Sequence, residues 1–161
     1  LLSASHPTQN GNQSNVLATA ADLSETSLES ILINISDMKD DRGLRIAAQG
    51  TQLIIPTAYQ FVAERLLESQ LRTGTADNDI NAIKAGGYLP KGYTIMRRLT
   101  DADAFFVQTD VPDGLKHFTR SAMKKGMEGD FETGNIRYKV RERYSFGHTD
   151  WRGVFGTEGA A

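Results

Sequence analysis

The stretch GDFETGNIRYKVRERYSFGHTDWRG, Gly129 to Gly153, alternates apolar and charged residues as no other part of the chain does. Ile136, Tyr138 and Val140 are separated by cations, and the full cationic row is Arg137, Lys139, Arg141 and Arg143. Because alternate side chains of a strand point to opposite faces, the stretch predicts a long strand with one apolar and one cationic face. We expect its apolar face to pack on the chain's own fold and its cationic face to meet a neighbouring molecule.

The cationic row suits nucleic acid, an acidic ligand or another protein chain, and a solvated strand face without a partner is the simplest alternative. Arg outnumbers Lys in the row, and guanidinium groups suit bidentate ion pairs across protein interfaces. Nucleic-acid binding usually adds stacking aromatic side chains on the cationic face, whereas the aromatic residues here fall on the opposite face. The row therefore favours protein–protein contact, and a nucleic-acid-binding module at 137–143 is the alternative.

Charge is distributed unevenly along the 161 residues, although the formal net charge is only −2. Residues 1–115 hold nine Lys and Arg against fourteen Asp and Glu, and residues 116–161 hold nine against six. An acidic and a basic portion suit head-to-tail contact between copies. The absence of cysteine excludes disulfides, thiolate metal sites and a thiol nucleophile.

The amino end is polar, and residues 1–21 predict a flexible arm. It lacks the charged start and apolar run of a signal peptide, and no stretch is long enough to be a membrane helix, so we expect no membrane partner. Because the sequence does not begin with Met, we expect a fragment or a processed product, with residues 1–21 as the remnant of an upstream region.

Hydrophobic periodicity predicts an α+β fold. A long amphipathic helix is expected over Asp22–Asp41, opened by a capping box of Asp22 and Glu25. A buried strand follows at 52–56, and then a helix over Thr57–Ser69. The apolar face of that helix is expected to carry Ala58, Phe61, Val62 and Leu66. A short helical turn at 80–85 and two strands at 93–99 and 104–110, joined by a turn at 100–103, precede the long final strand.

The sequence offers no convergent catalytic set, and we expect no enzyme, no cofactor, no metal and no small-molecule substrate. Its histidines lie far apart, and Ser145, His148 and Asp150 are too close in sequence for a triad, whose members converge from different parts of a fold. The segment from Asp77 begins like a calcium loop but lacks the required Gly and Glu. A small hydrolase would need a pocket joining distant residues.

Five segments in order carry a resemblance to a known family: ADLSETSLE, LIIPTAYQFVAERLLES, GTADNDINAIK, AFFVQTDVPDGLKHF and the stretch from Gly129. Together they resemble the carboxyl-terminal part of tailed-bacteriophage major capsid (head) proteins, including Mu-like head subunits, over roughly Asp22 to Gly156. The resemblance implies a two-lobed fold. A peripheral lobe would hold a spine helix with its connection at 22–50 and return strands at 113–156, and 51–112 would form an axial lobe, with a tail at 157–161.

The resemblance implies a structural subunit that self-assembles, as hexamers and pentamers, into the icosahedral shell around double-stranded DNA. Such a shell is a virion component assembled in the host bacterial cytoplasm, and the DNA would be a non-specific neighbour. The cationic row would then pair with acids of an adjacent subunit, for which Asp37, Asp40 and Asp41 are the candidates. Family members also carry an arm and a projecting hairpin at the amino end, for which residues 1–21 are too short and polar.

Overall fold

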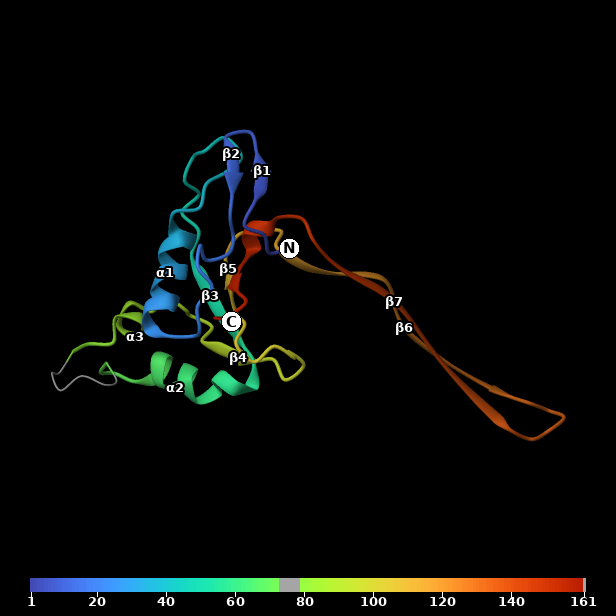
Figure 1. Ribbon diagram of the computed structural model, residues 1–161. Coiled ribbons are helices and arrows are strands. Elements are labelled where there is room, and N and C mark those ends of the chain that lie inside the picture. Colours follow the sequence, from blue (N-terminus) through green and yellow to red (C-terminus); the bar gives the residue numbers. More distant parts are fainter. Residues whose placement is uncertain (73–78, 161) are drawn as a thin grey trace.

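A four-stranded mixed sheet forms the centre of the molecule, in a computed structural model that describes residues 1–72 and 79–160. The strand order is β4-β3-β5-β8 (Figure 1). β3 (Gly50–Ile55) pairs parallel with β4 (Tyr93–Ile95) and antiparallel with β5 (Phe105–Thr109), and β8 (Val154–Thr157) pairs antiparallel with β5. The expected mixed α+β composition is confirmed.

Three helices pack on this sheet: α1 (Glu25–Ser36), α2 (Gln60–Glu68) and the short α3 (Ala82–Gly86). Short 3-10 turns precede α2 (η1, Thr57–Tyr59) and β8 (η2, Trp151–Gly153). Apolar side chains of helices and strands share one core, since burial of apolar area is the main driving force of folding. Its fully enclosed members include Leu28, Ile31, Ile35, Leu53, Ile55, Phe105 and Val107.

The long helix expected over Asp22–Asp41 is wrong in its length, and the described residues contain no long spine helix. The capping box is made by Ser24 and Ser27, two residues after Asp22. The helix ends at Ser36 because the Asp40 carboxylate accepts hydrogen bonds from the backbone N–H groups of Arg42 and Leu44, which closes a turn. Met38 lies after the end of the helix, and its side chain is buried. Its spacing in the sequence continues the apolar repeat of the helix although the residue is not helical.

The face expected for the second helix is right in part, since Val62 and Leu66 pack against the core, whereas Ala58 and Phe61 are exposed. Ala63 and Leu67 are buried, whereas Phe61 is 67% exposed. The chain enters as the tighter 3-10 turn η1, which advances the side chains differently from an α-helix. The two strands expected at 93–99 and 104–110 exist as β4 and β5, but β3 lies between them, so they are not neighbours.

The amino-terminal residues are ordered rather than the flexible arm expected. They form the hairpin β1 (His6–Thr8) and β2 (Gly11–Gln13), and Val16 pairs with Gly156 at the edge of the central sheet. Asn15 is fully buried and bonds to both ends of the chain, which explains why a polar segment holds its place.

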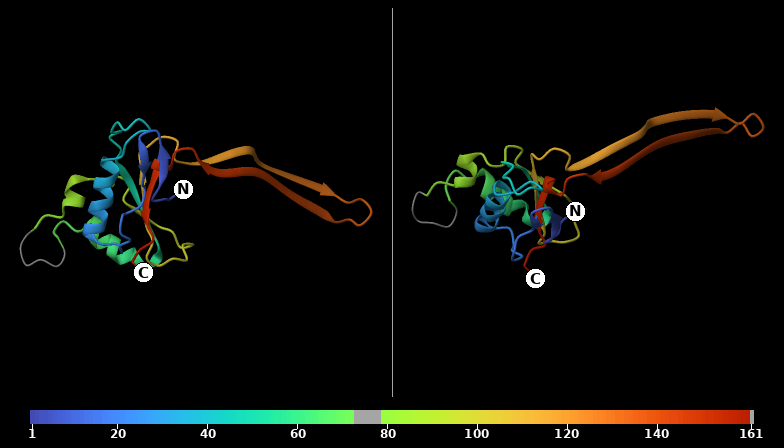
Figure 2. Two further views of the ribbon diagram at one scale, coloured as in Figure 1. Left: turned by 45° about the horizontal axis from the view of Figure 1, so that its top comes forward. Right: turned by 90° about the horizontal axis from the view of Figure 1, so that it is seen from above.

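The remaining strands leave the body of the molecule. Within residues 1–72 and 79–160, β6 (Leu115–Gly129) and β7 (Ile136–His148) pair only with each other, as a two-stranded antiparallel ribbon that projects away from the sheet and helices (Figure 2). In the described residues these two strands form a sheet of their own, and β8 joins the central sheet. The assignment of residues 113–156 to a peripheral lobe stays a prediction.

Candidate functional site

The projecting ribbon, residues 115–148, is the candidate interaction surface of this fold. β6 has 15 residues and β7 has 13, paired from Leu115 opposite His148 to Gly129 opposite Ile136. At about 3.3 Å per residue the ribbon extends about 40 Å. The long strand expected from the alternation is confirmed, and its partner β6 forms the other half of a hairpin that the sequence did not suggest.

One face of the ribbon carries the cationic row. In the strand register Arg141 lies opposite Lys124, and Arg143 lies opposite Ser121. Like charges directly across a ladder repel each other, so this pair is held together by the backbone and not by its side chains. Within the described residues, the row makes one ion pair, in which Arg137 contacts Asp130 at 3.6 Å.

The other face carries the apolar alternation. His117, Tyr144 and Phe146 form a cluster with ring centroids 5.0 to 5.4 Å apart. On β7 the aromatic side chains lie on the face opposite the cationic row, as predicted, but β6 mixes the two faces, because Phe118 pairs with Ser145 on the cationic face and Lys125 pairs with Val140 on the apolar face. The expectation that this face packs on the chain's own fold is wrong, because Tyr138 is 75% and Phe146 73% exposed. An isolated two-stranded ribbon is marginally stable in water, so we expect another molecule to pack on this apolar face and bury it.

The tip of the ribbon is a defined loop built around Asp130. The Asp130 carboxylate accepts hydrogen bonds from the Glu132 N–H (3.2 Å) and the Thr133 hydroxyl (2.8 Å). Its carbonyl accepts from the Gly134 N–H, and Gly134 takes the left-handed conformation that a tight turn requires. Phe131 on this loop is completely exposed.

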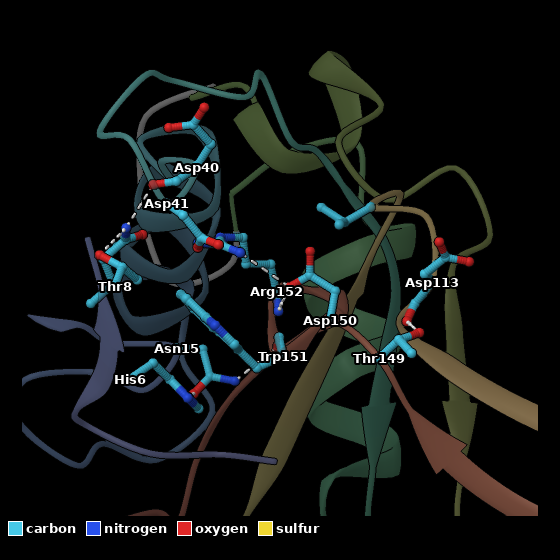
Figure 3. Close-up of polar contacts among 12 residues, drawn as sticks. His6, Thr8, Asn15, Asp40, Asp41, Asp113, Thr149, Asp150, Trp151 and Arg152 are labelled. Atoms are coloured by element: carbon cyan, nitrogen blue, oxygen red, sulfur yellow. Dashed lines mark hydrogen bonds and ion pairs between the residues drawn. The ribbon is translucent and has the colours of Figure 1, made fainter. Parts of the chain in front are cut away.

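The root of the ribbon is a close contact between two glycines. A Cβ on Gly153 would lie 2.4 Å from the Cα of Gly114, so neither position has room for a side chain. The carbonyl of Asp113 accepts hydrogen bonds from the backbone N–H groups of Thr149 and Asp150 and from the Thr149 hydroxyl (Figure 3). The two strands therefore leave the body at one fixed point.

Arg152 fastens this root to the body, and sequence reasoning missed it. Its side chain is 9% exposed, donates to the Lys39 carbonyl at 2.8 Å and pairs with the Asp41 carboxylate at 2.7 Å (Figure 3). The guanidinium also lies over the Trp151 ring, 4.4 Å from its centroid. In the sequence, the position of Arg152 between Trp151 and Gly153, just after the alternating strand, was the one feature that could have pointed to this role.

His6 and Asn15 complete the anchor from the amino-terminal segment. The His6 ring stacks on Trp151 with centroids 4.2 Å apart. Asn15 accepts from the Ser3 N–H, and its amide donates to the carbonyls of Trp151 and Val154. The polar residues expected to form a loose arm are thus part of the base that holds the ribbon (Figure 3).

The acids expected to face the cationic row lie on the body, where each has a contact within the chain. Asp37 pairs with Arg45 at 2.9 Å and is 52% exposed, and Asp41 pairs with Arg152 and is 66% exposed. Asp40 accepts the backbone N–H groups already described. Among the described residues these acids make no contact with the row, so the chain does not bring the two sets together by itself.

The other polar groups singled out in the sequence have structural positions. Asn81 caps α3, and the Asp101 carboxylate accepts the Asp103 N–H in an ordinary turn. Asp77 lies outside the described residues. No group of three or more His, Asp or Glu in the described ranges could hold a metal ion. Across the same ranges, none of the helices has the length and apolar character that crossing a membrane demands.

Comparison with known proteins adds two findings. The family described as "Phage capsid protein" matches residues 1–156. Among solved structures, a chain of Mycobacterium phage Che8 is similar with 16% sequence identity and a TM-score of 0.49, over 88% of this chain and 52% of that chain. This chain thus spans about half the length of that phage chain. No curated protein matches it.

Proposed function

We propose, from the premise that this chain belongs to the phage capsid protein family, that its ribbon joins it to other copies of itself in the shell of a phage head. The chain is a structural head subunit and a component of the virion, and the family's role is structural rather than enzymatic. The observation that carries the proposal is a ribbon about 40 Å long with both faces exposed, one apolar and one cationic.

Our proposal extends to the finer assignment that the sequence resemblance implies. The chain would be the carboxyl-terminal part of a Mu-like major capsid subunit, assembling as hexamers and pentamers into an icosahedral shell around double-stranded DNA. Residues 22–50 and 113–156 would belong to the peripheral lobe and 51–112 to the axial lobe. The mixed α+β architecture and the family match over residues 1–156 support this assignment.

The cationic row supplies the proposed polar contact. Arg137, Lys139, Arg141 and Arg143 would meet the acidic segment that follows α1 in a neighbouring copy. Asp37, Asp40 and Asp41 are the proposed counter-charges there, and more than half of the Asp37 and Asp41 side chains is open to a second partner. One exposed pair contributes well under about 1 kcal/mol. Because the same ion pairs would recur between many copies in a shell, their summed contribution would be large enough to affect assembly.

Reversal of one charge tests this proposal. Arg141→Glu is expected to lower particle yield and to flatten its dependence on salt, because an attractive contact that salt screens becomes repulsive. Particle yield would be measured by sedimentation across a salt series. Arg98→Glu is the control, since Arg98 is exposed and lies off the ribbon. An unchanged yield at every salt concentration for Arg141→Glu would count against the proposal.

Nucleic-acid binding by the same row is the second candidate, favoured by the position of Lys124, which widens the row opposite Arg141. It predicts that the unassembled subunit binds DNA with an affinity that falls steeply with salt. A filter-binding titration separates the two functions. Strong, salt-dependent binding that Arg141→Glu abolishes, with particle yield unchanged, would favour DNA as the partner.

A further inference from the structure

The apolar face of the ribbon consists of two apolar halves with charged residues between them. In the half near the root, Tyr144 and Phe146 form the aromatic cluster with His117. In the half near the tip, the strand register places Met127 opposite Tyr138, and both side chains are exposed. Exposed apolar side chains that gather on one surface mark a contact with another molecule. The partner of this face therefore has to offer apolar surface to both halves.

Glu142 and Lys125 are the charged residues between the two halves. Glu142 is the middle one of the 13 residues of β7, and alternation along the strand puts it on the same face as Val140 and Tyr144. Lys125 lies opposite Val140 in the register and so shares this face. Both charged side chains are exposed, and neither makes an ion pair with another described residue. Burying either charge is costly unless the partner brings the opposite charge.

The same face of a second copy meets both requirements. When two ribbons stack face to face in opposite directions, the aromatic half of each ribbon lies on the tip half of the other. Because Glu142 is at the middle of β7 and Lys125 lies one step nearer the tip, each Glu142 carboxylate then lies close to the Lys125 ammonium group of the other copy. Two reciprocal ion pairs bridge the centre of such a contact, which is symmetric and closes with two copies.

The shape of the molecule also favours opposite directions. Sheets that pack face to face lie about 10 Å apart, and the body is wider than the ribbon (Figures 1 and 2). Ribbons that stack in the same direction bring the two bodies side by side at that spacing, whereas opposite directions place the bodies at the two far ends of the contact.

The size of the face indicates where this contact forms. The face measures about 40 Å by two strand spacings, or about 400 Å². Stable complexes bury about 800 Å² on each partner. The contact therefore depends on further contacts between the same subunits, which a shell supplies, and it has to be tested in particles.

We propose that the apolar face of the ribbon packs on the same face of a second copy in the opposite direction, with Glu142 of each copy paired to Lys125 of the other. This inference rests on the proposed function and identifies the partner that buries the apolar face. The cationic row lies on the other face of β7, so it remains available to the acidic segment that follows α1 in a further copy.

Mixing two charge variants tests the ion pairs. Glu142→Lys and Lys125→Glu are each expected to raise the critical concentration for assembly of the full-length protein about five- to tenfold, because both pairs of the contact become repulsive. An equal mixture of the two variants is expected to assemble at the wild-type concentration, since unlike copies again pair opposite charges. Mixing cannot rescue a contact within one chain. Glu64→Lys, at an exposed position on α2, is the matched control and should leave the critical concentration unchanged.

Disulfide trapping in particles tests the direction of stacking, because the 161 residues contain no cysteine. Tyr138 belongs to the tip half and Tyr144 to the root half of the face. After mild oxidation, the double variant Tyr138→Cys, Tyr144→Cys is expected to give covalent dimers and no larger oligomers on non-reducing gels, whereas each single variant stays monomeric. Tyr138→Cys combined with Phe61→Cys, on exposed α2 surface, is the control for random collisions.

The outcomes separate this inference from the proposed function. Dimers of the single Tyr138→Cys variant mean that ribbons stack in the same direction, and a ladder of oligomers from the double variant means a head-to-tail contact. Either result, normal particles without dimers above the control, or a mixture of charge variants that assembles no better than its components would overturn this inference and leave the proposed function standing. Failure of the wild-type protein to form any particle would overturn both.

Discussion

At the scale of residues, the ribbon depends on a few polar side chains that are buried where the chain crosses itself. Arg152 joins the loop after α1 to the segment before β8, and Asn15 joins Trp151 and Val154 to the amino terminus. Buried polar groups with full sets of partners define one arrangement of the chain, because any alternative leaves them unpaired. These residues therefore determine the direction in which the ribbon leaves the body.

Replacement of Arg152 by Met should lower the free energy of unfolding by about 2–4 kcal/mol. The change keeps an apolar stem of similar length but leaves the Lys39 carbonyl without its donor and Asp41 without its ion pair. Urea denaturation of the unassembled subunit measures the effect. Arg98→Met, at an exposed position, should change stability by less than about 0.5 kcal/mol; equal effects of the two variants would show that the Arg152 contacts do not stabilise the fold.

At the scale of elements, the ribbon is regular along β7 and irregular along β6. The register shifts between Thr119 and Ser121 and again between Ser121 and Lys124, so β6 has extra residues relative to its partner. Such bulges increase the local twist and bend of a ribbon, and they interrupt an edge that could otherwise pair with another strand. The faces of the ribbon, rather than its edges, are thus suited to contact.

Gly153→Ala should disturb the ribbon at its root. The added Cβ would lie 2.4 Å from the Cα of Gly114, and backbone cannot move away without separating the two strands. We expect a loss of about 1–3 kcal/mol in stability, seen by thermal unfolding, together with reduced particle yield. Gly126→Ala is the control, because a Cβ there meets nothing within 4 Å. A stable Gly153→Ala subunit that assembles normally would contradict the role given to this contact.

At the scale of the whole molecule, stability is divided between a packed body and an extended ribbon. The core contains Leu53, Ile55, Phe105 and Val107, none of which is exposed, whereas more than half of the exposed large apolar side chains in the described part of the chain lie on residues 115–148. The body buries its apolar side chains against one another. The ribbon gains most of its burial only when a partner covers it.

Hydrogen exchange should separate these two parts. Backbone amides of β6 and β7 are expected to exchange quickly in the unassembled subunit and to become at least about tenfold slower in particles, because covering a marginal ribbon raises the free energy of its opening. Amides of β3 and β5, which are buried in the central sheet, should be slow in both states and serve as the internal reference. Equally fast exchange of the ribbon in particles would be incompatible with its role as an interface.

The sequence by itself determined some of the elements and the two faces of β7. Alternation of Ile136, Tyr138 and Val140 with cations is a local property of a strand, so it could be read without the fold, as could the buried strand at 52–56. The α+β composition and the family resemblance were accessible in the same way.

Only the tertiary structure decided that β6 is the sole partner of β7 among the described residues, that both faces of the ribbon are exposed, and that the polar amino terminus is ordered. Each of these depends on contacts between residues far apart in the chain. Arg152 with Asp41 and Asn15 with Val154 are more than one hundred positions apart. Periodicity shows which side chains share a face of a strand. It does not show which other part of the molecule packs on that face, and strand pairing and burial depend on that contact.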